Sequence, residues 1–124
     1  MRPTVLVADD DPQLLAVLED VLSKEFTVVT ARSGTAAVAQ FERHKIDIVV
    51  TDLAMPGLNG LQVATKCKAV RPSVPVVMLT AWDVLVTDED ATEAGVDEMI
   101  AKPVRVLQLG DLLRKRLAAS AASA

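Results

Sequence analysis

Two patterns of hydrophobic residues alternate along the chain: short runs rich in β-branched side chains, and longer stretches in which apolar residues recur every three or four positions. Several of the short runs are apolar at consecutive positions, which is typical of parallel strands covered on both faces. We therefore predict an α/β fold with a parallel sheet. The predicted strands are Thr4 to Ala8, Phe26 to Ala31, Ile46 to Thr51, Val74 to Thr80 and Glu98 to Ala101.

Capping residues mark the beginnings of the helices between these strands. Asp11 before Pro12 predicts an N-cap followed by proline in the first turn, because proline needs no hydrogen-bond partner for its nitrogen there. The predicted helices begin at Asp11-Pro12, Ser33-Gly34-Thr35, Asn59-Gly60, residue 84 and Val104, and the last two end at Ala94 and about Leu117. Five strands and five helices predict a doubly wound, flavodoxin-like sheet with strand order 2-1-3-4-5.

The length of 124 residues favours one compact domain, which we expect to cover residues 1–117. Residues 118–124 are rich in alanine and serine, and they are expected to form a tail, either a frayed helix end or the start of a linker. Cys67 is the only cysteine, so the chain has no internal disulfide, and a reducing compartment is expected. The sequence shows neither a leader peptide nor an apolar run long enough to span a membrane. We expect a cytoplasmic protein without membrane contact.

The charge balance argues against direct nucleic-acid binding. The net charge is −4 and the sequence pI is about 4.9, whereas affinity for a phosphate backbone comes from positive charge. Phe26, Phe41 and Trp82 are too few and too scattered to stack on a row of bases. If this domain acts on DNA, an attached domain must do the binding.

Candidate chemistry gathers where the predicted strands end. In an open parallel sheet, ligands bind beyond the carboxyl ends of the strands. The residues expected there are Asp9 and Asp10 after the first strand, Asp52 after the third, Thr80 after the fourth and Lys102-Pro103 after the fifth. Neighbouring carboxylates repel each other, by about 4 kcal/mol per pair at ~4 Å and an effective dielectric of ~20. A few carboxylates and waters suit Mg²⁺, and the lysine supplies a second positive charge.

At this stage four motifs carry a resemblance: VLVADDDP, DIVVTDLAMPGLNG, VVMLTA and AKP. Together they resemble the receiver domain of bacterial two-component response regulators over about residues 4 to 117. The spacing agrees as well, since Thr80 follows Asp52 by 28 residues and Lys102 follows Thr80 by 22. The resemblance implies that Asp52 accepts a phosphoryl group from a histidine kinase or phosphotransfer protein. Thr80 and Lys102 would each contact a phosphoryl oxygen.

The resemblance also implies a metal site. Asp9 and Asp10 would hold Mg²⁺, helped by an Asp52 oxygen and the main-chain carbonyl of Ala54. Pro103 is similar to the residue that fixes the loop of the lysine, and we expect a cis peptide bond before it. Activity would be limited to the domain's own phosphoryl transfer and dephosphorylation, so the chain is expected to be a signalling domain and not an enzyme.

The switch residues depart from the usual pattern of this family. Met99 stands three residues before the lysine, where a tyrosine or phenylalanine is usual, and Trp82 is expected beside the site. The resemblance implies that Thr80 and Met99 respond to phosphorylation. The fourth helix, fifth strand and fifth helix would then change their preference for a partner, which is an unidentified effector or a second copy in a homodimer.

Two other functions remain open from the sequence. A phosphatase of the haloacid dehalogenase type also uses an aspartate at a strand end with Mg²⁺, but it normally needs a second aspartate two residues on, where this chain has Ala54. A pseudo-receiver that only docks usually lacks the aspartate or the lysine, and both are present here. The residue pattern therefore favours a phosphoacceptor.

Overall fold

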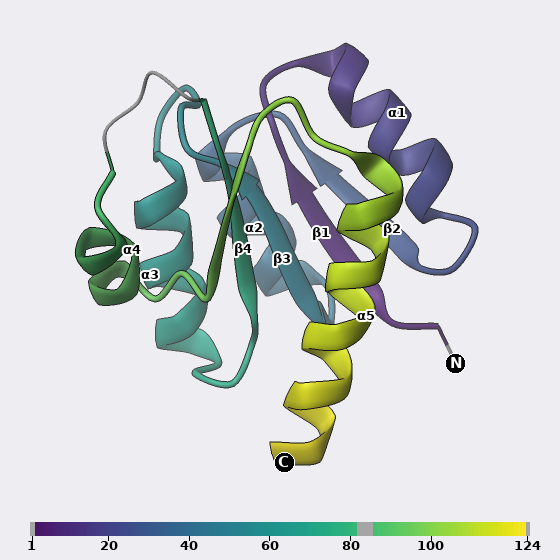
Figure 1. Cartoon of the computed structure of the whole chain (residues 1–124). Helices are drawn as coiled ribbons and strands as arrows, with labels where there is room; N and C mark the ends of the chain where they lie inside the picture. The colour runs from purple at the N-terminus through teal and green to yellow at the C-terminus, as the bar shows by residue number, and fades with distance from the viewer. Residues whose placement is uncertain (1, 82–85, 124) are drawn as a thin grey trace.

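The computed structural model describes residues 2–81 and 86–123, with side chains up to residue 120. Within these ranges the chain forms one parallel sheet in the order β2-β1-β3-β4-β5, with helices on both faces (Figure 1). The strands are β1 (Thr4–Ala8), β2 (Thr27–Ala31), β3 (Ile48–Asp52), β4 (Val76–Thr80) and β5 (Glu98–Ala101). The predicted fold class and strand order are confirmed, and three strands begin one or two residues later than predicted.

Two apolar layers hold the helices to the sheet. The described helices are α1 (Pro12–Leu22), α2 (Gly34–Arg43), α3 (Gly60–Val70), α4 (Asp88–Ala94) and α5 (Val106–Ser123). Side chains of α1 and α5, such as Leu18 and Leu113, pack with Val5 and Val50 on one face. The side chains that α2, α3 and α4 bury lie on the opposite face, and Phe41 is among them. Both faces of the central strands are therefore covered, as their continuous apolar runs predict.

The N-caps of the first three helices are confirmed. The side chain of Asp11 accepts hydrogen bonds from the backbone N–H groups of Gln13 and Leu14. Ser33 and Asn59 cap α2 and α3 in the same way. These short polar side chains satisfy N–H groups that lack a partner within the helix, which is why the sequence marks these helix starts so clearly.

The last two helices differ from the prediction at their ends. Residues 84 and 85 lie outside the described residues, and Val86 and Thr87 are not helical, so α4 begins at Asp88. The hydroxyl of Thr87 accepts a hydrogen bond from the backbone N–H of Asp90 at 3.0 Å, and this cap fixes the start. Helix α5 begins at Val106 and continues through residues 118–123, because alanine readily extends a helix. The segment expected to be a tail is thus helical up to Ser123.

The strand register places the candidate chemistry at one edge of the sheet. Ala8 on β1 lies beside Thr51 on β3, so the next residues, Asp9 and Asp52, emerge close together. Thr80 on β4 pairs with Ala101 on β5, directly before Lys102. In the described part of the chain, no helix combines the length and apolar character needed to cross a bilayer.

Candidate functional site

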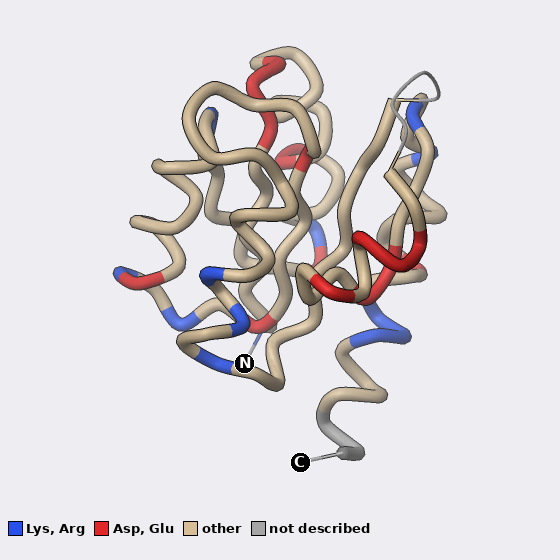
Figure 2. Tube along the Cα trace, turned by 90° about the vertical axis from the view of Figure 1, so that its left-hand side faces the viewer, with Lys and Arg blue, Asp and Glu red and all other residues tan. Residues whose placement is uncertain are grey.

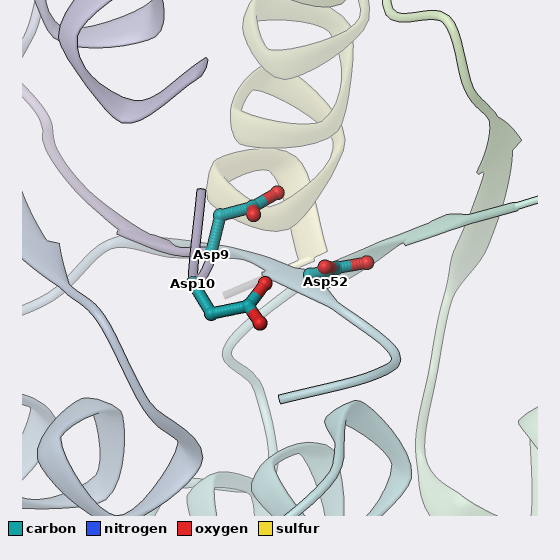
Figure 3. Close-up of side chains that lie close together, drawn as sticks. All are labelled: Asp9, Asp10 and Asp52. Atoms are coloured by element: carbon teal, nitrogen blue, oxygen red, sulfur yellow. The ribbon is translucent and has the colours of Figure 1, made fainter. Parts of the chain in front are cut away.

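Three carboxylates meet at the carboxyl ends of β1 and β3. Asp9, Asp10 and Asp52 each present one oxygen, and these oxygens lie within 4.8 Å of one another. Figure 3 shows the three side chains gathered in front of the two strand ends. Asp9 and Asp52 are buried, whereas Asp10 is exposed. The cluster predicted from the strand ends is therefore present, with one face open to solvent.

Lys102 reaches into this cluster from the end of β5. Its Nζ atom lies 3.1 Å from Oδ2 of Asp9 and 3.2 Å from Oδ2 of Asp52. The backbone N–H of Lys102 donates to the carbonyl of Thr80 at 2.7 Å, which fixes the residue at the end of the sheet. The peptide bond between Lys102 and Pro103 is cis, as predicted. The lysine thus joins β5 to both β1 and β3.

Backbone donors orient the two buried carboxylates. The N–H of Asp11 donates to Oδ1 of Asp9 at 2.9 Å, and the N–H of Leu53 donates to Oδ1 of Asp52 at 2.9 Å. In each carboxylate one oxygen is therefore held by the main chain while the other faces Lys102. Sequence reasoning assigned Asp11 to the helix cap alone, and its N–H has this second role.

The charges of the cluster perturb one another. Burial raises the pKa of Asp52 above its usual value, and the nearby charge of Asp9 raises it further, although Lys102 acts in the opposite direction. Burial alone would lower the pKa of Lys102, but the hydrogen bond to Asp9 and the charges of both aspartates outweigh it, so this pKa is raised. The lysine therefore stays protonated, but its single positive charge does not neutralise the three carboxylates of the cluster.

The donor set fits a hard divalent cation. Carboxylate oxygens are the ligands that Mg²⁺ prefers, and this ion usually keeps several waters, which the exposed side of the cluster can supply. Asp10, the exposed member, offers a carboxylate on that side. Ala54 lies exposed in the loop after β3, two residues beyond Asp52. An additional cation would offset the repulsion among the three carboxylates, of which Lys102 contacts only Asp9 and Asp52.

The two proposed switch residues lie on neighbouring strands. Thr80 is half-buried at the end of β4. Met99 pairs in register with Met78 and packs into the apolar layer on the side of α2, α3 and α4. Trp82, which was expected beside the site, lies outside the described residues. Met99 thus occupies a flexible apolar position between the sheet and the helices, where a thioether can repack readily.

A glycine that sequence reasoning treated only as part of a helix start supports the phosphoacceptor candidate from behind. A Cβ atom on Gly60 would lie 2.4 Å from the carbonyl oxygen of Asp52. The N–H of Gly60 donates to the carbonyl of Leu53 at 2.8 Å, so the first residue of α3 touches the end of β3. The Asn59-Gly60 pair in the sequence was the available signal for this close approach.

The chain is similar in sequence to two curated transcriptional regulatory proteins. The chain is 39% identical over 101 residues to the transcriptional regulatory protein GlrR of Escherichia coli, covering 81% of this chain and 23% of that protein. It is 37% identical over 117 residues to the probable transcriptional regulatory protein TcrX of Mycobacterium tuberculosis, covering 90% of this chain and 50% of that protein. This chain thus spans half or less of the length of these curated relatives.

A solved structure agrees in fold over nearly the whole chain. The response regulator receiver domain protein from Clostridium thermocellum superposes with a TM-score of 0.90 at 27% identity, covering 98% of this chain and 99% of that one. The family model for the response regulator receiver domain matches residues 5–114, a range that includes all three aspartates, Thr80 and Lys102. Receiver domains bind Mg²⁺ at an acidic pocket, and the cluster described above supplies one. The chain therefore belongs to the receiver domain family of two-component response regulators.

Proposed function

We propose that Asp52 accepts a phosphoryl group from a histidine kinase or phosphotransfer protein in a Mg²⁺-dependent reaction. The observation that carries this proposal is the unequal surroundings of the three carboxylates. Asp9 is completely buried, and Asp10 is exposed. Asp52 combines contact with Lys102 at 3.2 Å with a side chain that retains 9% of its exposure, so an incoming donor can reach it. It is the carboxylate that is both reachable and paired with the lysine.

In the proposed transfer, an oxygen of Asp52 attacks phosphorus while the bond between phosphorus and the donor nitrogen breaks. The donor imidazole keeps the electron pair of that bond and takes up a proton. Lys102 is placed to stabilise the charge on one phosphoryl oxygen, and the hydroxyl of Thr80 would hydrogen-bond another. Such transfers depend mainly on positioning and charge neutralisation, which fixed groups can supply.

Asp9, Asp10, Asp52 and the main-chain carbonyl of Ala54 would hold the magnesium ion. When bound, Mg²⁺ supplies positive charge that offsets the charge of the carboxylates and of the phosphoryl group. Asp9 is held by the N–H of Asp11 and by Lys102, so its carboxylate keeps one orientation. Asp10 is the exposed member and lies where a hydrated ion would enter. This division of roles is the part of the proposal that metal titration tests.

The output surface in this proposal consists of α4, β5 and α5. Phosphorylation adds negative charge at Asp52. Thr80 and Lys102 then move towards the phosphoryl group, and Met99 repacks between β5 and the helices. Helix α4 on this surface carries four acidic residues, seen among the red segments of Figure 2. These residues are Asp88, Glu89, Asp90 and Glu93. The surface would therefore recognise an effector, or a second copy on activation, partly through charge.

The direct test is phosphorylation with a small phosphodonor such as acetyl phosphate and Mg²⁺, followed by intact mass measurement. The wild type should gain one phosphoryl group that is stable in acid and labile in base, and Asp52→Asn should gain none. Asp11→Asn is the matched control, because asparagine also caps a helix, and it should be labelled like the wild type. Equal labelling of Asp52→Asn would contradict the assignment, and continuous release of phosphate from added monoesters would favour a phosphatase.

A further inference from the structure

We propose that Arg116 couples β5 to the C-terminal half of α5, so that a change at the phosphoacceptor end of the sheet displaces the helix at the opposite end. This inference rests on the function proposed above and assigns a positioning residue to it. Arg116 lies in the second half of α5, the half that is distant in sequence from Lys102. In Figure 1, α5 runs past the whole sheet, and its C-terminus lies beyond the end where the strands begin.

The contacts of Arg116 join the helix to Asp97, directly before β5, and to Glu98, the first residue of that strand. One guanidinium nitrogen, NH2, donates to the carbonyl oxygen of Asp97 at 3.0 Å and to Oε1 of Glu98 at 2.7 Å. The first contact reaches the main chain itself, so a movement of the strand backbone is transmitted without depending on a second flexible side chain.

Asp97 makes the base of β5 a fixed junction. Its Oδ2 atom accepts hydrogen bonds from the backbone N–H of Val76 and from Nζ of Lys68, both at 2.8 Å. Its own N–H donates to the carbonyl of Val76 at 2.8 Å. Strands β4 and β5 and helix α3 are therefore tied together at one residue. Arg116 attaches α5 to this group of elements.

Beyond Leu113, the described part of α5 has no fully buried side chain to set its position. A groove of about 430 Å³ lies beside this half of the helix and is lined by Lys68, Ser73, Arg116 and Ser120, among others. Ser120 makes only a long hydrogen bond, 3.4 Å, to the carbonyl of Ser73. Leu117 is partly buried and packs against the apolar layer shared with α1, whereas Arg116 ties this half of the helix to β5 by polar contacts.

Another arginine of the same helix makes the opposite connection. NH1 of Arg114 lies 2.6 Å from Oε1 of Glu25, which follows α1, and its NH2 pairs with Asp111 within α5. Helix α5 is therefore tied to the segment after α1 through Arg114 and to the start of β5 through Arg116. These two parts of the molecule also meet at the candidate site, where Lys102, directly after β5, contacts Asp9, which lies between β1 and α1. If phosphorylation moves β5 relative to β1 at the site, the movement should therefore reach α5 through Arg116.

The test compares Arg116→Gln with Arg114→Gln and the wild type, using amide chemical shifts before and after phosphorylation with acetyl phosphate and Mg²⁺. In the wild type and in Arg114→Gln, amides of residues 114–120 should shift on phosphorylation. In Arg116→Gln these shifts should be lost, while the rate of labelling stays within about twofold of wild type because the substitution is distant from the site. Glu98→Gln removes the negative charge of one partner of the arginine but keeps an acceptor oxygen, and it should weaken the same response.

The outcomes separate the two proposals. If the wild type is labelled and residues 114–120 shift equally in Arg116→Gln, or do not shift in the wild type, the coupling is wrong while the phosphoacceptor function stands. If Arg114→Gln loses the response as fully as Arg116→Gln, the assignment to Arg116 is also wrong. If the wild type itself takes no label, both proposals fall. If Arg116 had a purely structural role, Arg116→Gln would change the chemical shifts of residues 114–120 by the same amount with and without phosphorylation, and the response to phosphorylation would remain.

Discussion

The two ends of the sheet both carry charged side chains, but they balance them differently. At the end where the strands begin, two ion pairs each join one acid to one base, Lys68 with Asp97 and Arg116 with Glu98. At the carboxyl end, among the described residues, three carboxylates lie together and Lys102 contacts two of them, Asp9 and Asp52. The paired groups are partly exposed, whereas Asp9 and Asp52 are buried. Balanced pairs hold elements together. In the unbalanced cluster, the excess negative charge attracts a cation, and Lys102 can contact a phosphoryl group.

Removing one lysine from each end should break the comparison most strongly. Lys102→Met should slow phosphorylation of Asp52 by about 100-fold, the usual effect of deleting one charge-stabilising group at a transition state. Lys68→Met removes the same charge at the other end and should leave the rate within about twofold of wild type. Labelling time courses with acetyl phosphate measure both rates. Equal rates for the two variants would show that the lysine beside Asp52 has no special role.

Magnesium should stabilise only the unbalanced end. At about ten times its dissociation constant, a ligand that binds only the folded state adds roughly 1.4 kcal/mol to the free energy of unfolding. Thermal unfolding with and without MgCl₂, at ionic strength matched with NaCl, should show this gain for the wild type. Asp10→Asn should show much less of it. An identical gain in the variant would place the ion away from Asp10.

Replacing the phosphoacceptor should stabilise the metal-free protein. Asp52→Asn removes a buried charge that repels Asp9, and Tm should rise by roughly 2–5 °C, which corresponds to about 1 kcal/mol in a domain of this length. The raised pKa of Asp52 means that its carboxyl group binds a proton more tightly in the folded state than in the unfolded state. The wild type therefore loses stability relative to the variant as pH rises from about 4, near the unfolded pKa, through the raised folded pKa.

Thermal unfolding in EDTA across this pH range measures the difference between the two proteins. The gap should be small at acid pH and widest near neutrality, because both proteins are uncharged at position 52 in acid. A variant that is less stable than the wild type at neutral pH would show that the contact with Lys102 outweighs burial and repulsion.

The same substitution at the balanced end should have the opposite sign and the smallest size. Asp97→Asn weakens the contact with Lys68 but can keep an acceptor for the N–H of Val76. Because both side chains are partly exposed, the loss should stay below about 1 kcal/mol. Denaturant unfolding of the metal-free protein measures it. A gain in stability would remove the distinction between the two ends.

The fold was predictable because its signals are local. Continuous apolar strands, and caps such as Asp11 and Asn59, are visible within a few residues. The start of α4 was missed because a longer apolar-to-acidic stretch was given to the helix, although Thr87 before three acidic residues is a readable cap. The helical state of residues 118–123 was left open, since a short alanine and serine segment is compatible with a frayed helix end and with a linker.

The candidate site was predictable only in part. Strand ends meet at one edge of a parallel sheet, so the cluster of Asp9, Asp10 and Asp52 followed from topology. The junction at Asp97 did not, because its partners Lys68 and Val76 come from other elements and their approach depends on tertiary register. The direction in which Met99 points likewise required the sheet itself, since a half-buried edge position has no alternation clear enough to assign its face.

The close approach of Gly60 to Asp52 bears on how this protein tolerates genetic variation. A methyl group there would sit 2.4 Å from the Asp52 carbonyl oxygen, and β3 has little freedom to retreat, because the N–H of Leu53 is bonded to the carbonyl of Leu79 at 3.0 Å. Even alanine, harmless at most helix starts, would push the phosphoacceptor backbone out of place. In a saturation mutagenesis scan, position 60 should therefore be as intolerant as the acidic residues, although it contributes no chemical group.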